Sequence, residues 1–585
     1  MRLPSAQLLL NQTGSVIRRF PLEILISLAG TCIALMLTQD HLPDSKQWLL
    51  IRLLLMCLLA LPSFIAVNIS TGYRNAGFTT KLLMYTVVLV AIAMLFFSFS
   101  KEHDRPKDII RYSMLNVAAH LLVACAGFIG RGSTHAFWQY NRVLFLRIIT
   151  SAIFSGVLFL GLIGAMAALN ELFNLHLSES WYPRIFIIIA GVFNTVFFLY
   201  GIPANPQELE AGETYPKVLS IFTRFVLLPL VFIYFAILLA YEVKIITAWQ
   251  LPNGWVSNLI IAFAIAGILS ILLVYPIRLL QEHKWVKVFA RWFYILMLPL
   301  IVLMFVAIGK RISDYGFTEE RLIVLVTTAW LALVSLYFLW KPQGDIRIIP
   351  FSLALLAICL QFVIFSISEN SQRGRLKKLL GKYGLLKNGV AQKLQANQSI
   401  DKKDAESIQS VVRYLAELHG KESLDPILPT KQLSAGKSNE YLLSTKYLDS
   451  LGYVKNTPSD AYGHTDFLSA EKSFINIEGY RTLIPISSQY QSTLGGWQAW
   501  TEKNKIIIYA DKDKPAAEIN LSAFADSVFR AHPPGGSGKN YIAQANLMYS
   551  VQQNSNSFTM VIETLNRRED RDGYLLDITG FVLLK

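Results

Sequence analysis

Charged residues are scarce in this sequence. Of its 585 residues only 16% are Asp, Glu, Lys or Arg, whereas 53% are hydrophobic and the mean hydropathy is +0.41. A soluble chain carries far more charge, about a quarter of its residues. The composition therefore excludes a soluble enzyme that occupies the whole length, and it indicates a membrane protein.

Cysteine is also rare. The four cysteines all lie inside apolar runs, at Cys32, Cys57, Cys125 and Cys359. The polar part of the chain therefore has no thiol for a disulfide framework or a thiolate zinc site. The net charge of +14 is spread over short loops and the C-terminal third instead of one basic stripe. This distribution argues against nucleic-acid binding and suits a membrane surface.

Long apolar runs are abundant. A run of about 17 to 25 apolar residues is long enough to cross the hydrocarbon core of a bilayer. Eleven such runs precede residue 368: Pro21–Leu37, Trp48–Val67, Leu82–Phe99, Tyr112–Ile129, Ile148–Leu169, Pro183–Ile202, Phe222–Tyr241, Val256–Tyr275, Trp292–Ile308, Leu322–Leu339 and Ile348–Ile367. Tryptophan and tyrosine gather at their ends, where amphipathic rings favour the headgroup layer. We therefore expect a bundle of about eleven transmembrane helices over residues 1–367.

The Lys and Arg residues of short loops predict the orientation of such a bundle. More of them lie on the side of the N-terminus, which predicts a cytoplasmic N-terminus. With eleven spans the C-terminal region then lies outside the cytoplasm. The last run is nevertheless followed by a basic cluster that normally stays in the cytoplasm, made of Arg373, Arg375, Lys377, Lys378 and Lys382. From these opposing signals we expect an extracytoplasmic C-terminal domain.

The composition turns polar after Ser368. We expect residues 368–400 to form a basic amphipathic juxtamembrane linker and residues 401–585 to form a soluble domain. Apolar spacing predicts helices over Asp401–His419 and Ser438–Leu451, stopped by glycines. Strand patterns occur at Ser473–Ile477, Tyr480–Ile486, Lys505–Ala510, Tyr541–Gln552, Ser557–Asn566 and Tyr574–Leu584. The expected fold is a membrane all-α bundle followed by a soluble α+β domain with an antiparallel sheet.

Strongly polar side chains in the apolar runs are expected to have a hydrogen-bond partner or a functional role, because placing a charged side chain at the bilayer centre costs at least about 2.5 kcal/mol. The candidates for an intramembrane polar site are Asn116, His120, Asn194, Arg224, Glu242 and Lys244. They would line a cavity or relay protons. The structural alternative is that the amides and the histidine bond between helices, while the charged residues snorkel or mark a helix end. We favour the structural alternative.

Catalytic and metal-binding motifs fail in the C-terminal third. Residues 533–540 resemble a phosphate loop only superficially, since Asn540 stands where Ser or Thr is required. The histidines His419, His464 and His532 are far apart and lack the spacing of metal ligands. We therefore assign no catalytic residue and expect no metal and no cofactor.

The most distinctive stretch runs from Tyr215 to Ile277. It contains the segment Leu251, Pro252, Asn253, Gly254, Trp255, Val256 and Ser257. This stretch resembles a family of bacterial polytopic membrane proteins catalogued as domain of unknown function 4153. A second set of residues looks like the juxtamembrane part of long members: Ser368, Ser371, Gln372, Arg375, Ile408, Tyr414, Leu415, His419 and Gly420. The resemblance implies the inner membrane of a bacterium and transfers no activity.

The residues of this segment also have a structural interpretation. Pro252 and Gly254 shape a tight turn, Trp255 anchors at the interface and Ser257 caps the next helix. We favour this structural use. The alternative is that the turn, together with Glu242 and Lys244, forms the mouth of a binding site.

Three functions remain compatible with the sequence. In the first, a non-enzymatic role, the soluble domain senses or binds an envelope partner while the helices anchor or transmit. The second is a transporter or lipid-handling carrier, which requires Asn116, His120, Asn194 and Arg224 to face one water-accessible cavity. The third is a membrane-embedded transferase with a carboxylate such as Glu171 or Glu242 beside a lipid-open groove.

The first function is favoured by the large polar domain and the poverty of catalytic residues. Expected partners are the lipid bilayer and an envelope protein or lipid-linked ligand, and no nucleic acid. The sequence leaves the oligomeric state open.

Overall fold

A computed structural model describes most of the chain. The described residues are 6–39, 42–100, 105–173, 178–205, 209, 221–248, 255–276, 284–395, 398–428, 448, 451–453, 465–470, 480, 482–487, 492–494, 497–502, 504–511, 514–532, 540–553, 556–570 and 573–584. The chain divides into two compact units, Met1–Gln392 with Ser410–Ser434 and Lys393–Gln409 with Ala435–Lys585. The division falls within one helix, α16 (Lys402–Tyr414).

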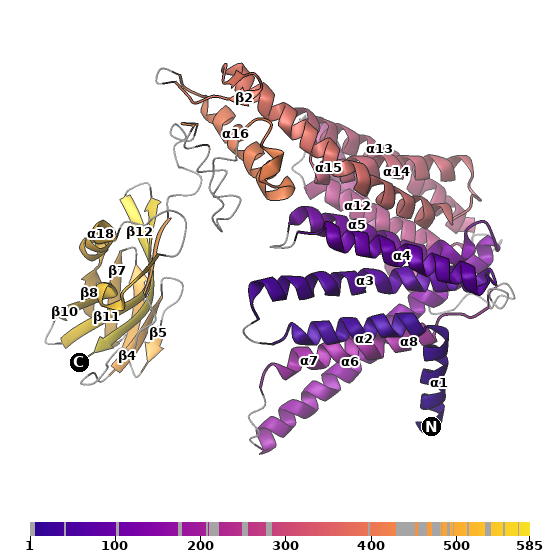
Figure 1. Cartoon of the computed structure of the whole chain (residues 1–585), viewed down its shortest axis with the longest axis horizontal. Helices are drawn as coiled ribbons and strands as arrows, with labels where there is room; N and C mark the ends of the chain where they lie inside the picture. Colours follow the sequence, from indigo (N-terminus) through magenta and orange to yellow (C-terminus); the bar gives the residue numbers. More distant parts are fainter. Residues whose placement is uncertain are drawn as a thin grey trace. The chain divides into compact units, whose positions relative to one another are not determined.

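The first unit is a helical bundle (Figure 1). Its helices are α1 (Ala6–Arg19), α2 (Pro21–Met36), α3 (Asp44–Tyr73), α4 (Phe78–Ser98), α5 (Pro106–Cys125), α6 (Thr134–Phe173), α7 (Trp181–Ile188), α8 (Asn194–Tyr200), α11 (Leu228–Ala248), α12 (Trp255–Leu273), α13 (Lys284–Tyr315), α14 (Glu319–Trp340) and α15 (Ile348–Lys382). Two π-helical turns, η2 (Ile189–Phe193) and η3 (Thr223–Leu227), lead into α8 and α11.

Nine helices within the described residues are long and apolar enough to cross a membrane, or up to ten if Thr13–Arg19 and Pro21–Met36 form one span. These two segments are bent by 104° relative to each other. All eleven expected runs lie on described helices, with α12 as a shorter apolar helix. The membrane bundle is thus confirmed. Its count by length and composition is nine to ten, because α12 is short and the first span is bent.

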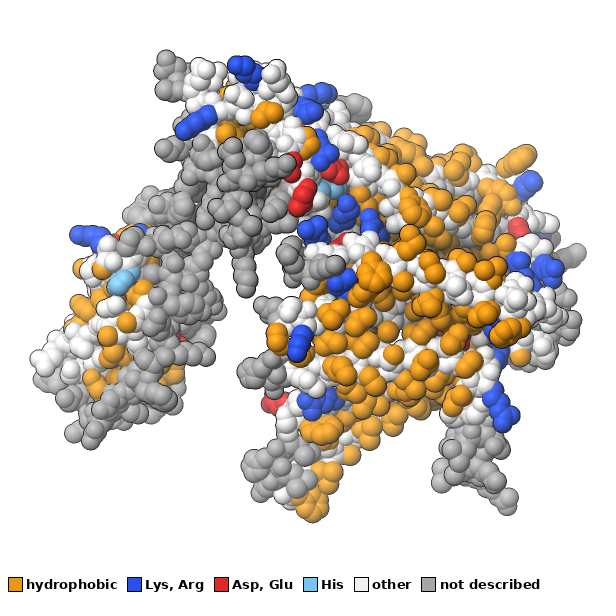
Figure 2. Space-filling model, in the orientation of Figure 1, with side chains coloured by type: hydrophobic (Ala, Val, Ile, Leu, Met, Phe, Trp, Pro, Cys, Tyr) orange, Lys and Arg blue, Asp and Glu red, His pale blue; other side chains and the backbone are white. Residues whose placement is uncertain are grey.

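The surface of the bundle matches a bilayer environment. Figure 2 shows hydrophobic side chains over the face of the bundle that is in view, with Lys and Arg gathered toward the ends of the helices. Apolar residues such as Leu160 and Phe97 are 69% and 74% exposed, whereas Tyr140, Leu199 and Leu300 inside the bundle are fully buried. Helices satisfy their own backbone hydrogen bonds, so only their side chains meet lipid.

The C-terminal part of the second unit contains two sheets. The strands are β3 (Thr465–Ala470), β4 (Thr482–Ser487), β5 (Ser492–Leu494), β6 (Trp497–Glu502), β7 (Lys505–Asp511), β8 (Lys514–Asn520), β9 (Asn540–Ile542), β10 (Met548–Gln553), β11 (Asn556–Asp570) and β12 (Gly573–Leu584). One sheet has the order β4-β12-β11-β3-β9, with β10 also paired to β11, and the other has the order β5-β6-β7-β8. All pairs are antiparallel except β3 with β9.

Both sheets and the helix α18 (Ser522–Ala531) share one apolar core, which includes Ile508, Phe529 and Phe558. Alternate residues of a strand point to one face, so each strand sends every second side chain inward. The C-terminal region with antiparallel sheets and a helix confirms the expected fold class.

Several expected elements differ in detail from the structure. The helix expected over Asp401–His419 is α16 followed by a π-helical turn, η6 (Leu415–His419). The strand expected over Tyr541–Gln552 is interrupted by a 3-10 turn, η9 (Gln544–Leu547). The first part of the expected linker, up to Lys382, is helical and completes α15. The helix expected over 438–451 and the strand over 473–477 lie outside the described segments, apart from isolated residues.

Candidate functional site

A dense cluster of polar side chains in the described part of the bundle surrounds Glu319, the first residue of α14. Glu319 is only 1% exposed. The hydroxyls of Ser368 and Tyr414 donate hydrogen bonds to its Oε1 and Oε2. His419 Nε2 lies 3.1 Å from Oε1. A carboxylate removed from water needs such partners, because an unpaired buried charge is strongly destabilising.

The partners come from segments that are far apart in sequence. Ser368 lies on α15, whereas Tyr414 ends α16 and is 95 residues from Glu319. The turn η6 follows directly and packs against α5 and α15. Its Leu415 and Ala416 are buried, at 0% and 2% exposure. Apolar burial therefore draws η6 onto the bundle, and this docking places the polar side chains beside the carboxylate.

His419 ends η6 and is enclosed. Its imidazole is 1% exposed, and Nδ1 lies 3.7 Å from Oε2 of Glu369. Neither ring nitrogen makes a hydrogen bond of normal geometry. The ring of Phe365 lies 6.5 Å from the imidazole, and Lys107 and Arg111 lie over that same Phe365 ring at 5.2 and 5.3 Å. Two cations, an aromatic ring, an imidazole and two carboxylates thus form one continuous cluster.

The turn between α13 and α14 is fixed by α15. Gln372 Nε2 donates to the carbonyls of Tyr315 and Phe317 at 2.9 and 2.8 Å. Ser371 Oγ accepts from the backbone N–H of Phe317 at 3.0 Å. Arg375 also donates to the Tyr315 carbonyl at 3.0 Å. These bonds satisfy backbone groups at a helix end and hold the start of α14 in place.

The end of η6 is fixed as well. Arg373 Nε donates to the carbonyl of Ser423 at 2.6 Å and pairs with Glu369 at 2.6 Å. Gly420, which follows His419, has φ +86°. This left-handed conformation favours glycine and ends the helix. Contacts made by the residues before and after His419 therefore fix its position.

The hydroxyl of Tyr414 is a persistent donor. Burial, and after it the Glu319 carboxylate, raises the pKa of Tyr414 well above its ordinary value. The phenol therefore keeps its proton at physiological pH and continues to bond the carboxylate. The arrangement suits a fixed joint better than a reactive centre, because both acidic oxygens already have partners and water is excluded. Within the described ranges, no three His, Cys, Asp or Glu residues are arranged to hold a metal.

The polar residues singled out from the sequence have other partners. Asn116 donates to the Tyr112 hydroxyl at 2.7 Å, and His120 Nδ1 lies 2.9 Å from the Asn116 carbonyl, so both contacts run along α5. Asn194 at the start of α8 accepts from Ser155 of α6 at 3.3 Å. The hydrogen bonds of Asn116 and His120 thus lie within α5, whereas that of Asn194 joins α8 to α6. None of these bonds links the pair on α5 to Asn194.

The remaining candidates lie around α11 and α12. Glu242 is 8% exposed and Lys244 is exposed, both on α11. Arg224 belongs to η3, and its side chain lies outside the described part. Within the family-like segment, Trp255 begins α12 and Ser257 lies within it, whereas Leu251, Pro252 and Gly254 fall in an undescribed stretch.

The centre of the cluster has no local sequence signature. Ser368 and Tyr414 are marked only by the family resemblance, His419 is marked also as a histidine that lacks metal-ligand spacing, and Glu319 is not marked at all. An acidic residue at the start of an apolar helix is a common feature, because it interacts favourably with the helix dipole. The available signal was therefore weak.

The fold and this site define a class: a multi-pass membrane protein in which the chain that follows the last membrane helix docks back onto the bundle through a buried charge cluster. A family model described as domain of unknown function (DUF4153) matches residues 25–371. The chain belongs to this family. The matched region includes Glu319 and Ser368 and ends before Tyr414 and His419.

One relative is an uncharacterized protein of Pasteurella multocida (strain Pm70). It is 27% identical over 252 residues, which cover 42% of this chain and 42% of the relative. The similarity thus spans less than half of the relative's length. No solved structure matches the chain.

Proposed function

We propose that this protein resides in the inner membrane of a bacterium, that its C-terminal region binds an envelope partner, and that α16 and η6 couple this region to the bundle. One observation carries the proposal. After leaving the bundle with α15, the chain returns and buries Tyr414 and His419 against Glu319.

A simple tether between an anchor and a soluble domain needs no such burial. The Glu319 carboxylate is paired by the hydroxyls of Ser368 and Tyr414, and a buried pairing of this kind favours one arrangement over its competitors, because any other packing leaves the carboxylate unpaired. A joint with one preferred arrangement can be biased by a partner that binds on one side of it. This property favours sensing or partner binding over passive anchoring.

We propose further that the C-terminal region lies outside the cytoplasm. The basic residues around the end of α15 are the main argument against this orientation. Two of them, Arg373 and Arg375, donate to the backbone carbonyls of Ser423 and Tyr315. Part of the positive charge of this cluster therefore has a structural use, and this weakens its value as a topology signal.

The two alternative functions have less support. A polar-cavity carrier would draw Asn116, His120 and Asn194 together, and their hydrogen bonds run along α5 and between α6 and α8. For a transferase, Glu171 is exposed at the end of α6 and Glu242 is buried on α11. Among the described residues, neither carboxylate contacts an acid or base in an arrangement that suggests group transfer.

Photo-crosslinking in living cells tests the partner. A benzophenone amino acid is placed in the full chain at exposed sheet positions such as Glu518 and Glu563, with lipid-facing Leu160 as the matched control. We expect the sheet positions to give a covalent product with the same envelope protein, absent from the control. A scan of all exposed sheet positions that yields no protein product would refute partner binding by this region.

Reporter fusions after Leu339 and at Lys585 test the orientation independently. A reporter active only outside the cytoplasm should work at Lys585. If only the cytoplasmic reporter works there, the partner must be sought in the cytoplasm and the envelope proposal is wrong.

Hydrogen exchange of the full chain tests the coupling. Glu319→Gln should accelerate exchange of the η6 amides about tenfold, because it replaces the charged acceptor of the Tyr414 hydroxyl by a neutral one and a hydrogen bond to a charged group is stronger by roughly 1 kcal/mol, while Glu320→Gln should not. Equal exchange in the two variants would remove the assigned coupling role and leave partner binding intact.

A further inference from the structure

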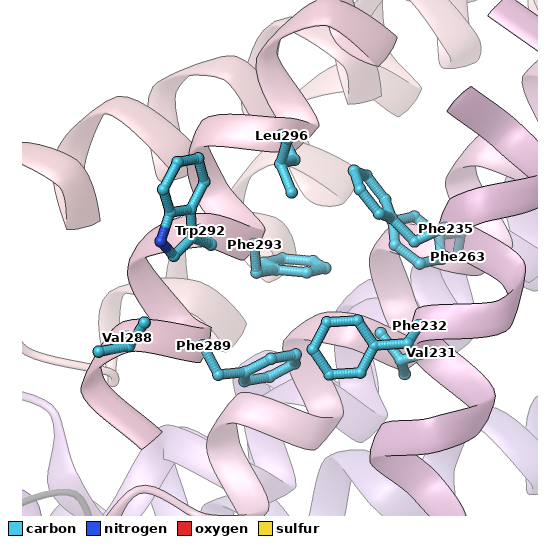
Figure 3. Close-up of a pocket in the computed structure, with 9 residues that line it drawn as sticks. All are labelled: Val231, Phe232, Phe235, Phe263, Val288, Phe289, Trp292, Phe293 and Leu296. Carbon is cyan, nitrogen blue, oxygen red and sulfur yellow. The ribbon is translucent and has the colours of Figure 1, made fainter. Parts of the chain in front are cut away.

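A cavity of about 470 Å³ lies between α11, α12 and α13. Six of its nine lining residues are aromatic. Figure 3 shows Phe289 and Phe293 pointing from α13 toward Phe232, Phe235 and Phe263. This volume falls within the range of small-molecule pockets, roughly 300 to 1,000 Å³. None of the residues that line this cavity belongs to the cluster around Glu319.

The cavity has a buried wall and an exposed mouth. Phe263, Phe289 and Phe293 are between 5% and 8% exposed, whereas Val288 and Trp292 are each 55% exposed. All these residues lie on apolar helices of the bundle, and the outer surface of such helices faces hydrocarbon. The mouth therefore opens toward the bilayer, where the available occupants are lipid chains.

Packed aromatic rings form the wall of the cavity. Phe263 contacts the rings of Phe235 and Phe293 with centroids 5.6 and 5.8 Å apart, and Phe232, which is 57% exposed, meets the buried Phe289 at 5.5 Å. A Cβ at Gly267 of α12 would overlap the Phe293 ring. Glycine at this position thus allows the ring to lie against α12. Rigid aromatic packing of this kind forms the cavity before any ligand binds.

Two cations lie on the exposed face of α13 next to the mouth. Lys287 and Arg291 are exposed and each precedes a mouth residue, Val288 or Trp292, by one position on α13. Residues four apart share a helix face and successive residues are about 100° apart, so the two cations form a row on the outer face of α13, turned away from the cavity lining. Their long side chains can reach along the helix surface to a headgroup at the mouth. The helix begins at Lys284 and carries no acidic residue before Asp314. The charge beside the mouth is therefore uniformly positive along α13.

We propose that the cavity binds an acyl chain of an anionic phospholipid whose phosphate contacts Lys287 and Arg291. Basic residues at the end of membrane helices attract anionic headgroups, and the aromatic cavity next to them accepts hydrocarbon. A neutral lipid offers the chain without the complementary charge. Charge complementarity and the neighbouring cavity together select this class of lipid.

The test uses the full chain in nanodiscs of phosphatidylcholine that contain a small fraction of a probe with a photoreactive diazirine in its acyl chain. The probe is phosphatidylglycerol in one arm and phosphatidylcholine in the other. Labelled peptides are quantified by mass spectrometry. We expect the phosphatidylglycerol probe to label the α11 and α13 peptides that line the cavity at least five-fold more than the other lipid-facing helices.

Two pairs of variants complete the test. Val288→Trp narrows the mouth and should abolish the excess label, whereas Val302→Trp, at a 60% exposed position of the same helix, should not. Lys287→Gln and Arg291→Gln should each lower the phosphatidylglycerol signal about five-fold, in line with the usual contribution of one basic residue near a membrane surface, whereas Lys341→Gln should leave it unchanged.

Three outcomes would overturn the proposal. They are even labelling of all lipid-facing helices, equal labelling by the two probes, and full labelling of Val288→Trp. Equal labelling by the two probes would indicate a hydrocarbon site that does not recognise the headgroup, which contradicts the proposed ligand. Circular dichroism and gel filtration of each variant separate loss of the site from loss of the fold.

Discussion

Two clusters of similar chemistry occupy opposite environments in this protein. Around Glu319 in the bundle, the carboxylate and the His419 imidazole are 2% and 1% exposed. Around Tyr574 in the C-terminal domain, the hydroxyl donates to Asp526 at 2.9 Å, and Asp526 lies 3.7 Å from Arg567 with exposures of 37% and 29%. Each cluster contains a carboxylate, a phenol, a basic side chain and an aromatic ring.

The comparison shows that access to water, more than the list of partners, decides what a charge pair does. Removing one partner from a buried pair leaves an uncompensated charge and costs about 3–5 kcal/mol. Removing one from an exposed pair lets water replace it and costs about 0–1 kcal/mol. The first cluster can fix one arrangement of the chain, whereas the second adds only a modest restraint on α18.

The largest effect is expected for Glu319→Ala. The change leaves the buried Tyr414 hydroxyl without its acceptor and removes the carboxylate 3.1 Å from the His419 imidazole, so we expect the free energy of unfolding to fall by about 3–5 kcal/mol. Thermal unfolding of the full chain in detergent measures this loss. The control is Glu320→Ala, an exposed neighbour, which should stay within about 0.5 kcal/mol of the wild type. Similar losses in both variants would show that the cluster contributes little.

Gly420→Ala should have the next largest effect. The residue has φ +86°, and a side chain in this conformation costs about 1–2 kcal/mol. We expect faster hydrogen exchange in η6 and a lower unfolding temperature. Gly374→Ala, in the interior of α15 with no atom near the added methyl group, should instead stabilise by about 0.5–1 kcal/mol. A destabilisation of the same size at both positions would contradict the role of φ.

Tyr574→Phe should cost about 1 kcal/mol, because it removes the hydroxyl that bonds to Asp526 and keeps the ring under Arg567. Burial first, and then the hydrogen bond to Asp526, raises the pKa of Tyr574. The folded domain therefore holds this proton more tightly than the unfolded chain does.

This contribution to stability is complete below the ordinary tyrosine pKa near 10 and disappears as the pH rises through the higher folded value. Hydrogen exchange of the strand β12 in both proteins, measured between pH 8 and 11 and corrected for intrinsic exchange, tests this. The difference between wild type and Tyr574→Phe should shrink at high pH. A constant difference would contradict the assignment.

The smallest effect is expected for Lys505→Ala. Lys505 pairs with Glu518 across β7 and β8, and the two side chains are 48% and 47% exposed. We expect a change of about 0–1 kcal/mol that decreases further at high salt. Chemical denaturation at low and high salt measures it. A loss of unfolding free energy comparable to that of Glu319→Ala would contradict the conclusion that exposed pairs contribute less than buried ones.

The sequence predicted the elements whose pattern is local. The spacing of Ile408, Val411, Val412 and Leu415 predicted the helix that the structure shows as α16 and η6, and Gly420 as its end has the expected left-handed backbone. The apolar runs predicted the membrane helices, because run length is a direct requirement of bilayer thickness.

Other elements were not predicted from the sequence. The strands β6 and β8 carry few strongly apolar residues, and the helix α18 has only ten residues, although Ala525, Val528 and Phe529 face the core at helical spacing. The predicted strand from Tyr541 is broken at Gln544, whose side chain donates to the Ile562 carbonyl at 3.0 Å. This bond depends on tertiary structure and left no trace in the sequence pattern.

The cluster around Glu319 could not be predicted from local sequence patterns, because it too depends on tertiary structure. Its carboxylate and the Tyr414 hydroxyl meet only because α14, α15 and η6 pack together. Asn116 and Asn194 were candidates because they are polar residues within apolar runs. In the structure, the side chain of each makes a hydrogen bond. Whether any of them serves a function stays a prediction.

The π-helical turn η6 makes the residue count of this segment as important as its composition. A π-helical turn is in effect an α-helix with one residue inserted. The wider turn absorbs this extra residue, so the residues that follow keep nearly the phase of an unbroken α-helix. Inserting a second residue between Tyr414 and His419 exceeds what one such turn absorbs and would rotate His419 by about 100° relative to Tyr414. Every side chain needed for the cluster would still be present, yet the imidazole would no longer face Glu319. Further insertion is therefore expected to be suppressed across these few positions in related chains that keep the cluster.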